Sequence, residues 1–240
     1  MSEESMSKKA RCVEDLRRRI LTQDLEAGSY LDEVVVANAY EISRPPLREI
    51  LNQLAGEGYV VLHKNRGAQI APMTHKTLRN FFIAAPMIYA ATTRLAAEQA
   101  TPAQIMRLKD TQVLFRKAIR DAAIAECALM NQRFHAIIGE IADNEFLMPS
   151  LRRLLIDHTR IGMSFYNPRN MLMEHERSEA ADQHDQFIEL IQLGDADAAG
   201  ELAIAHWELS RAEIESFVAP RGIDYPLGPR PSVLDQKGAP

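Results

Sequence analysis

Three histidines and one asparagine lie at inward-facing positions of three separate helical patterns. Asn131 and His135 are four residues apart, so both side chains leave the same face of one helix, which also carries Ile138. His184 and His206 lie on apolar faces of two later helices. A polar group that turns inward has to find a hydrogen-bond partner or a metal ion, because leaving it unsatisfied costs roughly 1–3 kcal/mol. A helical bundle would bring these four side chains into one cluster.

Two chemistries fit such a cluster. Imidazole nitrogens suit Zn²⁺, Ni²⁺ and related divalent ions, and an open coordination position could hold a further ligand. Alternatively, each histidine is a core residue that bonds to a neighbouring side chain. His158, beside Asp157 and Arg160, could line the same cavity. The remaining histidines are expected at the solvated surface: His63, His75 and His175.

A second set of residues is suited to bind an anion. Arg44 and Arg48 are four residues apart, which places them together on one helix face, away from the apolar face that starts at Leu47. Ser43 is a suitable N-cap, and Pro45 suits a first helical turn, where the proline's missing N–H is not needed. The pattern predicts a helix that begins at residue 44 and offers two arginines to an anionic partner.

The elements around these arginines predict a winged helix-turn-helix. Helices are expected at residues 8–22, at 32–40 after a possible cap at Asp32, and at 44–56. A β-rich run follows at 58–62, and Asn65, Arg66 and Gly67 suit the tip of a hairpin that returns at 68–71. In this arrangement the third helix enters the major groove of DNA, and Arg66 reaches a phosphate or a minor groove.

Long helical patterns fill the rest of the chain. We expect helices at about 75–99, 102–120, 122–141, 145–165, 174–193 and 195–218, separated by proline, asparagine and glycine residues. The fold is therefore expected to be mainly α, with an N-terminal winged helix-turn-helix over 1–73 and a C-terminal antiparallel all-α bundle over 74–219. Residues 220–240 are rich in proline and glycine and are expected to form a flexible tail.

Composition limits the possible classes of protein. The 240-residue chain carries a net charge of -5, and its first 73 residues hold nearly equal numbers of basic and acidic side chains, so DNA binding would depend on the pattern of charges. No apolar run approaches the roughly 20 residues that cross a bilayer, and the polar N-terminus is not a signal segment, so we expect a cytoplasmic protein. Cys12 and Cys127 are expected in the core, and methionines such as Met87 are expected to fill it.

Taken together, these motifs resemble the GntR family of bacterial transcription regulators, in the FadR-type branch with an FCD effector domain. The resemblance covers about residues 10–218. It implies that Arg44 and Arg48 contact DNA and that Gly67 lets the wing tip approach a groove. Its N-terminal part is carried by Ile42-Ser43-Arg44-Pro45-Pro46-Leu47-Arg48-Glu49, Glu57-Gly58-Tyr59-Val60 and Asn65-Arg66-Gly67.

The C-terminal part of the resemblance implies a divalent-metal site. It is carried by Asn131 and His135, by the pair Asn144 and Leu147, and by His184, Gly194-Asp195 and His206. Relatives usually have aspartate where this chain has Asn131, and the matching histidines complete the site. Asparagine still ligates through its carbonyl oxygen but removes a negative charge, so zinc or nickel is expected to bind more weakly.

The resemblance also places effector-facing residues on the first bundle helix. Relatives commonly carry an arginine and a glutamate where this chain has Ala85 and Tyr89. With His158 and Arg160, these residues form the expected effector site. The substitutions predict an effector less polar than the small carboxylates that many relatives sense.

We therefore expect a metabolite-responsive transcription regulator, not an enzyme, which binds palindromic operator DNA as a homodimer. Two alternatives remain open. One is a metal-dependent hydrolase with an accessory winged helix, although no convincing general base is present, and Glu140 is expected to face outward. The other is a DNA-binding scaffold whose histidines only bond to one another.

Overall fold

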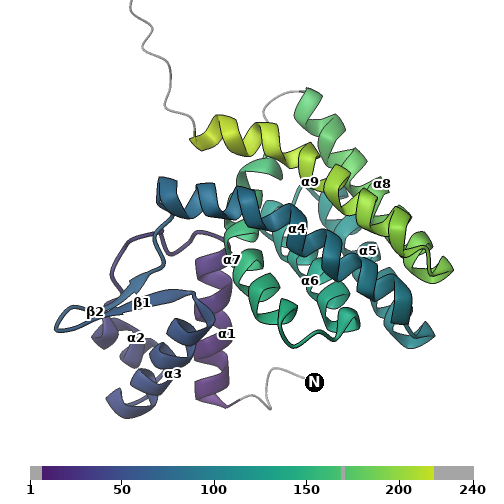
Figure 1. Ribbon diagram of the computed structural model, residues 1–240. Coiled ribbons are helices and arrows are strands. Elements are labelled where there is room, and N and C mark those ends of the chain that lie inside the picture. The colour runs from purple at the N-terminus through teal and green to yellow at the C-terminus, as the bar shows by residue number, and fades with distance from the viewer. Residues whose placement is uncertain (1–6, 169–170, 219–240) are drawn as a thin grey trace, which may run out of the picture.

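A computed structural model describes residues 7–168 and 171–218 (Figure 1). Its N-terminal part contains three helices, α1 (Lys8–Leu21), α2 (Glu33–Ala39) and α3 (Arg44–Glu57). An antiparallel hairpin of β1 (Val60–His63) and β2 (Gly67–Ile70) follows, in the register Val60↔Ile70 to His63↔Gly67. This is the expected winged helix-turn-helix, with the hairpin as its wing.

Helix α2 forms although its three consecutive valines favour a strand. Asp32 lies at its N-cap, and the carboxylate accepts hydrogen bonds from the backbone N–H groups of Val34 at 2.9 Å and Val35 at 3.1 Å. Only Val36 of this short helix is buried. Capping and packing against neighbouring helices therefore outweigh the β propensity of the valines.

Ser43 is the N-cap residue of α3, as expected, but its side chain makes no capping hydrogen bond. A capping oxygen accepts from the N–H of the second or third helical residue. In α3 those residues are Pro45 and Pro46, neither of which has an N–H. The prolines themselves set the helical start, and Gly58 ends the helix with φ +94.

The C-terminal part is a bundle of six helices within the described residues. They are α4 (His75–Gln99), α5 (Pro102–Arg120), α6 (Ile124–Ala142), α7 (Leu147–Phe165), α8 (Met171–Leu193) and α9 (Ala196–Val218). The expected ranges agree with these to within three residues. The predicted tail at 220–240 lies outside the described residues. No described helix has the length and apolarity needed to cross a membrane.

Helix α7 lies where the two parts of the molecule meet (Figure 1). It is buried on every side from residue 154 to 162, including the polar stretch Asp157 to Arg160. Ile156 packs into the apolar core of the winged domain, whereas Leu155 and Ile161 belong to the core of the bundle. One helix thus contributes to both cores.

Of the residues expected in the core, two cysteines are buried and one methionine is not. Cys12 and Cys127 are fully buried free thiols, as expected. Met87, in contrast, is 63% exposed on α4, so the prediction that it fills the core is wrong. On α4, Ala85 and Tyr89 point inward, whereas Met87 between them in the sequence points to solvent.

Candidate functional site

The fold brings the three predicted histidines together. His135 lies on α6, His184 on α8 and His206 on α9, and one ring nitrogen of each lies within 4.8 Å of the others. Asn131, one turn before His135 on α6, is 4% exposed. His135 and His184 are buried, and His206 is partly buried. The inward orientation expected from the helical patterns is therefore confirmed.

Several polar atoms of this cluster have no partner within the described residues. They are Oδ1 of Asn131, Nε2 of His135 and Nε2 of His184, all buried from solvent. Such atoms are costly unless something satisfies them. An amide oxygen and imidazole nitrogens are donors that a divalent transition metal accepts. The residues present therefore fit a metal ion.

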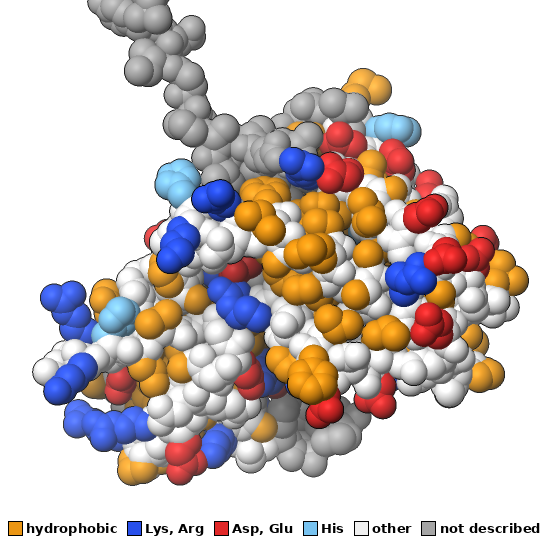
Figure 2. Space-filling view, viewed as in Figure 1, with side chains coloured by type: hydrophobic (Ala, Val, Ile, Leu, Met, Phe, Trp, Pro, Cys, Tyr) orange, Lys and Arg blue, Asp and Glu red, His pale blue; other side chains and the backbone are white. Residues whose placement is uncertain are grey.

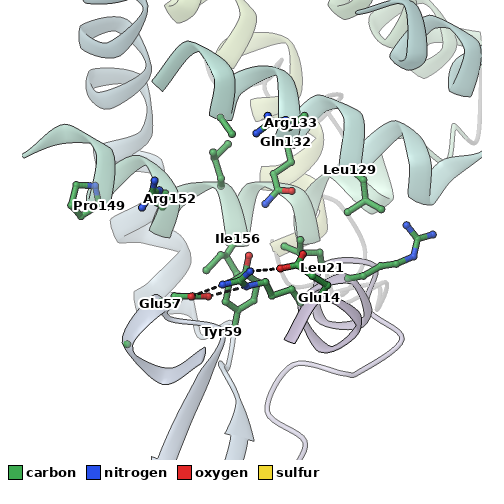
Figure 3. A pocket seen from close by; sticks show the side chains of 15 residues that line it. Glu14, Leu21, Glu57, Tyr59, Leu129, Gln132, Arg133, Pro149, Arg152 and Ile156 are labelled. Atoms are coloured by element: carbon green, nitrogen blue, oxygen red, sulfur yellow. Dashed lines mark hydrogen bonds and ion pairs between the residues drawn. The ribbon is translucent and has the colours of Figure 1, made fainter. Parts of the chain in front are cut away.

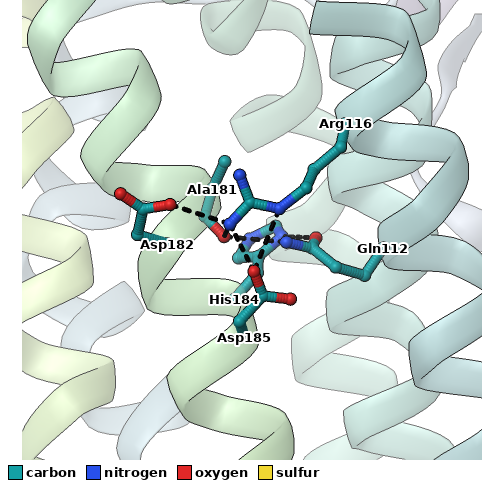
Figure 4. A network of polar contacts seen from close by, with 6 residues as sticks. All are labelled: Gln112, Arg116, Ala181, Asp182, His184 and Asp185. Atoms are coloured by element: carbon teal, nitrogen blue, oxygen red, sulfur yellow. Dashed lines mark hydrogen bonds and ion pairs between the residues drawn. The ribbon is translucent and has the colours of Figure 1, made fainter.

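Hydrogen bonds outside the cluster orient His184. Gln112 donates from Nε2 to the backbone oxygen of Ala181 at 2.7 Å, which turns its Oε1 toward Nδ1 of His184 at 3.2 Å. Nδ1 then carries the ring proton and donates it, and Nε2 keeps a lone pair directed into the cluster. Arg116 donates to the same Ala181 oxygen and to Asp182 and Asp185 (Figure 4).

The other rings are fixed in related ways. His206 Nδ1 lies 2.8 Å from Oε1 of Gln183, so the same assignment leaves its Nε2 free. The ring of Phe134 stacks on His184 at a centroid distance of 4.1 Å and an interplanar angle of 5°. Neighbouring side chains therefore hold the rings of His184 and His206 in place.

Burial keeps these imidazoles neutral. It lowers the pKa of His135 and of His184 well below the usual value, and the neighbouring histidines lower both further. The pKa of His206 falls to about 3 for the same reason. A neutral imidazole is the form that binds a metal ion. Near neutral pH the three rings are therefore ready for ligation without losing a proton.

Two of the four predicted effector-facing residues lie beside this cluster. Tyr89 shares a hydrogen bond of 2.6 Å with Nδ1 of His158, and both line a residual cavity of about 10 Å³ together with His206 and Trp207. A second cavity, of about 20 Å³, lies next to Asn131 and is also lined by His158 and His206. These volumes are of the order of one water molecule.

The other two predicted effector-facing residues do not line these cavities. Ala85 is fully buried in the apolar core of the bundle. Arg160 points toward the winged domain, where it donates to the backbone oxygen of Ala71 at 2.9 Å and to Asp157 at 3.2 Å. His158 and Arg160 are two residues apart on a helix, so they leave opposite sides of it. Arg160 therefore lies apart from His158 because both sides of α7 are buried, and an effector-facing role for Ala85 and Arg160 stays a prediction.

The predicted DNA-contacting arginines are exposed. Arg44 and Arg48 project from α3, and Arg66 lies at the wing tip. The part of the chain that the structure describes gives none of their side chains a partner. Lys and Arg side chains gather along this outer edge of the N-terminal domain (Figure 2). Gly67 has φ +77, a conformation that glycine adopts without strain.

Salt bridges hold α3 in place behind this surface. Arg17 of α1 donates from Nε to Glu57 at the end of α3 at 3.0 Å, and Lys9 of α1 contacts Glu49. Both acidic residues form ion pairs with α1, so the charged side chains of α3 that remain unpaired and exposed are its two arginines. Such an arrangement suits contact with a polyanion.

Sequence reasoning missed the side chains that support the histidines. Gln112 and Gln183 are buried polar residues on inward faces of α5 and α8. A glutamine on the apolar face of a helix was the available signal, but the sequence does not show which histidine it meets. Trp207 is 2% exposed and also lines the cavity with Tyr89.

A winged helix-turn-helix joined to a helical bundle with a candidate metal cluster is the architecture of a transcription regulator. Comparison with known families agrees with this. Residues 8–70 match the model described as bacterial regulatory proteins, gntR family, and residues 87–209 match the FCD domain. The chain belongs to the GntR family, in the group that carries an FCD domain, as the sequence motifs predicted.

The relatives of this chain are regulators too. It is 27% identical over 195 residues to the HTH-type transcriptional repressor RspR of Escherichia coli, covering 80% of this chain and 82% of that protein. It is 28% identical over 224 residues to the putative L-lactate dehydrogenase operon regulatory protein of Escherichia coli, covering 84% of each. The family and its members regulate transcription and are not enzymes, so the hydrolase alternative is wrong.

Solved structures share the fold. The structure of E. coli McbR/YncC covers 89% of this chain and all of its own length, with a TM-score of 0.75 at 15% identity. A putative transcriptional regulator GntR from Rhodococcus sp. RHA1 has a TM-score of 0.65 at 18% identity and covers 90% of this chain. At this level of identity the likeness concerns the fold alone.

Proposed function

We propose that this chain is a metabolite-responsive regulator that binds palindromic operator DNA as a homodimer. Residues 1–73 form the DNA-binding domain in this proposal, and 74–219 form the domain that receives the signal. The observation that carries it is the pair of unpartnered arginines on the exposed start of α3, beside an arginine-tipped wing. Its family membership supports DNA binding as the use of this surface.

The proposed DNA contacts come from both parts of the motif. Arg44 and Arg48 contact base edges or phosphates in the major groove, and Ser43 and Pro45 set the angle at which the helix enters it. Arg66, next to Gly67 at the wing tip, contacts a phosphate or the minor groove. In a dimer with twofold symmetry two such surfaces meet half-sites about one helical turn apart.

Replacement of Arg48 with alanine tests this surface. The loss of a contact to a base or phosphate is expected to weaken operator binding by about 1–3 kcal/mol, because the guanidinium is exposed and has no intramolecular partner to lose. Fluorescence anisotropy at fixed salt measures it. Arg120→Ala, which removes an exposed arginine from α5, is the matched control. Equal affinity for both variants would refute the assignment of α3 as the recognition helix.

For the bundle we propose a divalent metal, zinc or nickel, held by Asn131, His135, His184 and His206. The unpartnered atoms of Asn131, His135 and His184 support it, as does the neutral state of the rings. A bound ion would supply a Lewis-acidic position for an oxygen of an effector. Tyr89 and His158 are the residues of this chain that face that position.

The proposed dimer surface is an apolar stripe on α4 and α9, the α4/α9 face, which includes Ile83, Met87 and Ile204. These two helices lie side by side across one side of the bundle, and hydrophobic side chains gather over them (Figures 1 and 2). All three residues are exposed in the single chain. A contiguous apolar face of this kind marks an interaction surface. A second copy of the chain is the partner that a palindromic operator requires.

Met87→Glu tests the α4/α9 face. A charge buried without a partner in the interface costs on the order of 2–5 kcal/mol, so the variant is expected to dissociate where the parent chain is a dimer. Size-exclusion chromatography with light scattering measures the mass. Val113→Glu on α5 is the control, because Val113 is 65% exposed and Met87 is 63% exposed. A dimeric Met87→Glu variant would place the interface elsewhere.

We further propose that α7 couples the two domains. His158 faces the histidine cluster, while Asp157 and Arg160 face the winged domain. Arg153, one turn before Asp157, packs against Gly58, the C-cap of the recognition helix, where an added Cβ would lie 2.6 Å from its Cδ. A ligand that shifts α7 would therefore move the end of α3, provided that it binds the two arrangements with different affinity.

A further inference from the structure

A cleft separates the winged domain from the bundle. Its volume is about 750 Å³. Helix α1, the end of α3 and Tyr59 form one wall, and α6 and α7 form the other (Figure 3). Small-molecule sites in proteins commonly have volumes of roughly 300–1,000 Å³. The cavities beside the histidines, of about 10 and 20 Å³, are far smaller. In this arrangement the cleft, unlike those two cavities, already has room for a metabolite.

Arginines outnumber acidic residues in the lining of the cleft. Four arginines line it, against two glutamates, Glu14 and Glu57. Both glutamates are paired with one of the arginines, Arg17. Arg18 and Arg133 are paired with Glu126 and Glu140, which do not line the cleft. The charges of Arg18 and Arg133 are thus neutralised by acidic residues that lie outside the cleft.

Arg152 differs from these three. It lines the cleft from α7, is exposed, and has no ion-pair or hydrogen-bond partner in the described part of the chain. A guanidinium offers a planar set of donors that matches a carboxylate, phosphate or sulfonate. The free donor set of the cleft is therefore suited to an anion.

The remaining lining is apolar with a few polar groups. Leu129 of α6 and Leu155 and Ile156 of α7 contribute side chains, and Ala136 of α6 leaves space where a larger residue would fill the cleft. Gln132 of α6 and Tyr59 line it from opposite sides. An apolar wall beside an unpaired arginine favours a ligand with an apolar body and a charged end.

We propose that this cleft binds an amphipathic organic anion, whose charged group meets Arg152 and whose apolar body lies against Leu129 and Leu155. The site is separate from the histidine cluster and stands independently of it. A bound ligand would touch α1 and the end of the recognition helix on one side and α6 and α7 on the other. Its effect on operator binding rests on the proposed function, whereas ligand binding itself does not.

The probe is 1-anilinonaphthalene-8-sulfonate, an aromatic sulfonate that fluoresces in apolar surroundings. It is titrated into the full-length, DNA-free protein, and decanoate and decylamine are then added as competitors of equal chain length and opposite charge. We expect saturable binding that decanoate displaces and decylamine does not. Absence of saturable binding, or equal displacement by both competitors, would overturn the proposal.

Two substitutions locate the probe. Arg152→Glu reverses the charge of the unpaired donor and is expected to weaken binding at least about tenfold, since a charge-assisted hydrogen bond is lost and a repulsion is added. Arg120→Glu, at an exposed site on α5, is expected to have no effect. Ala136→Phe fills the cleft without changing charge and should also exclude the probe. Equal binding by Arg152→Glu and Arg120→Glu, or full binding by Ala136→Phe, would assign the probe to another surface.

Operator affinity with and without decanoate is measured separately. A change that disappears in Arg152→Glu would link the cleft to DNA binding. If the protein binds no operator at all, the proposed function fails while the fluorescence result still decides whether the cleft is a site.

Discussion

Zinc or nickel added to the metal-free protein is expected to raise its melting temperature by about 10 °C. At a thousandfold excess over the dissociation constant, a ligand that binds only the folded state contributes about 4 kcal/mol. For a chain of this size each kcal/mol corresponds to roughly 2–4 °C. The expected effect is large because the ligand atoms of His135 and His184 are already oriented, neutral and unpartnered. Differential scanning fluorimetry before and after chelation measures it.

Substitution of the histidines assigns this shift to the cluster. His184→Ala should abolish it, whereas His175→Ala, an exposed histidine on the same helix, should leave it intact. Gln112→Ala should weaken the metal by about 10–100-fold, because the Nδ1 of His184 loses the partner that fixes its tautomer. Asn131→Asp should tighten metal binding, because it introduces a negatively charged ligand. A shift that survives in His184→Ala would place the metal elsewhere, and no shift in the parent protein would favour histidines that only bond to neighbouring side chains.

Arg160→Met is expected to lower the free energy of unfolding by about 3 kcal/mol. The Arg160 side chain is 1% exposed, and its removal leaves the 5% exposed carboxylate of Asp157 with less compensation and the backbone oxygen of Ala71 without its donor. Breaking a buried ion pair from one side typically costs about 3–5 kcal/mol. Arg153 also contacts Asp157, at 2.8 Å, so the lower end of that range is expected. Urea denaturation at constant m value measures the loss.

The neighbouring arginine provides the control for this prediction. Arg153→Met removes the other contact of Asp157, but its side chain is 40% exposed, so the loss is expected to stay below about 1 kcal/mol. Arg160→Met should also open the segment between the domains near Ala71 to proteases, since the link from α7 to that segment is lost. Similar losses for the two variants would mean that Arg160 does not hold the domains together.

The sequence by itself determined most of the local structure. The capping box of Thr101 and Gln104 and the proline at 102 start α5 at the predicted residue. The hairpin turns at the predicted Asn65 to Gly67. These features depend on hydrogen bonds and backbone angles within a few residues, which is why they are readable from the chain. Helical spacing likewise placed Asn131 and His135 on an inward face.

Tertiary structure alone decided what those faces meet. Periodicity shows that a residue points inward but not which neighbour it contacts, so Gln112 as the partner of His184 could not be foreseen. The same limit explains why Arg160 was expected beside His158, whereas the structure turns it toward Ala71. A helix with two buried sides has no solvent face, and its polar residues face two different domains: His158 turns to the histidine cluster and Arg160 to the winged domain. The cleft with its unpaired Arg152 exists only because the domains pack as they do, since its two walls come from segments at least 70 residues apart.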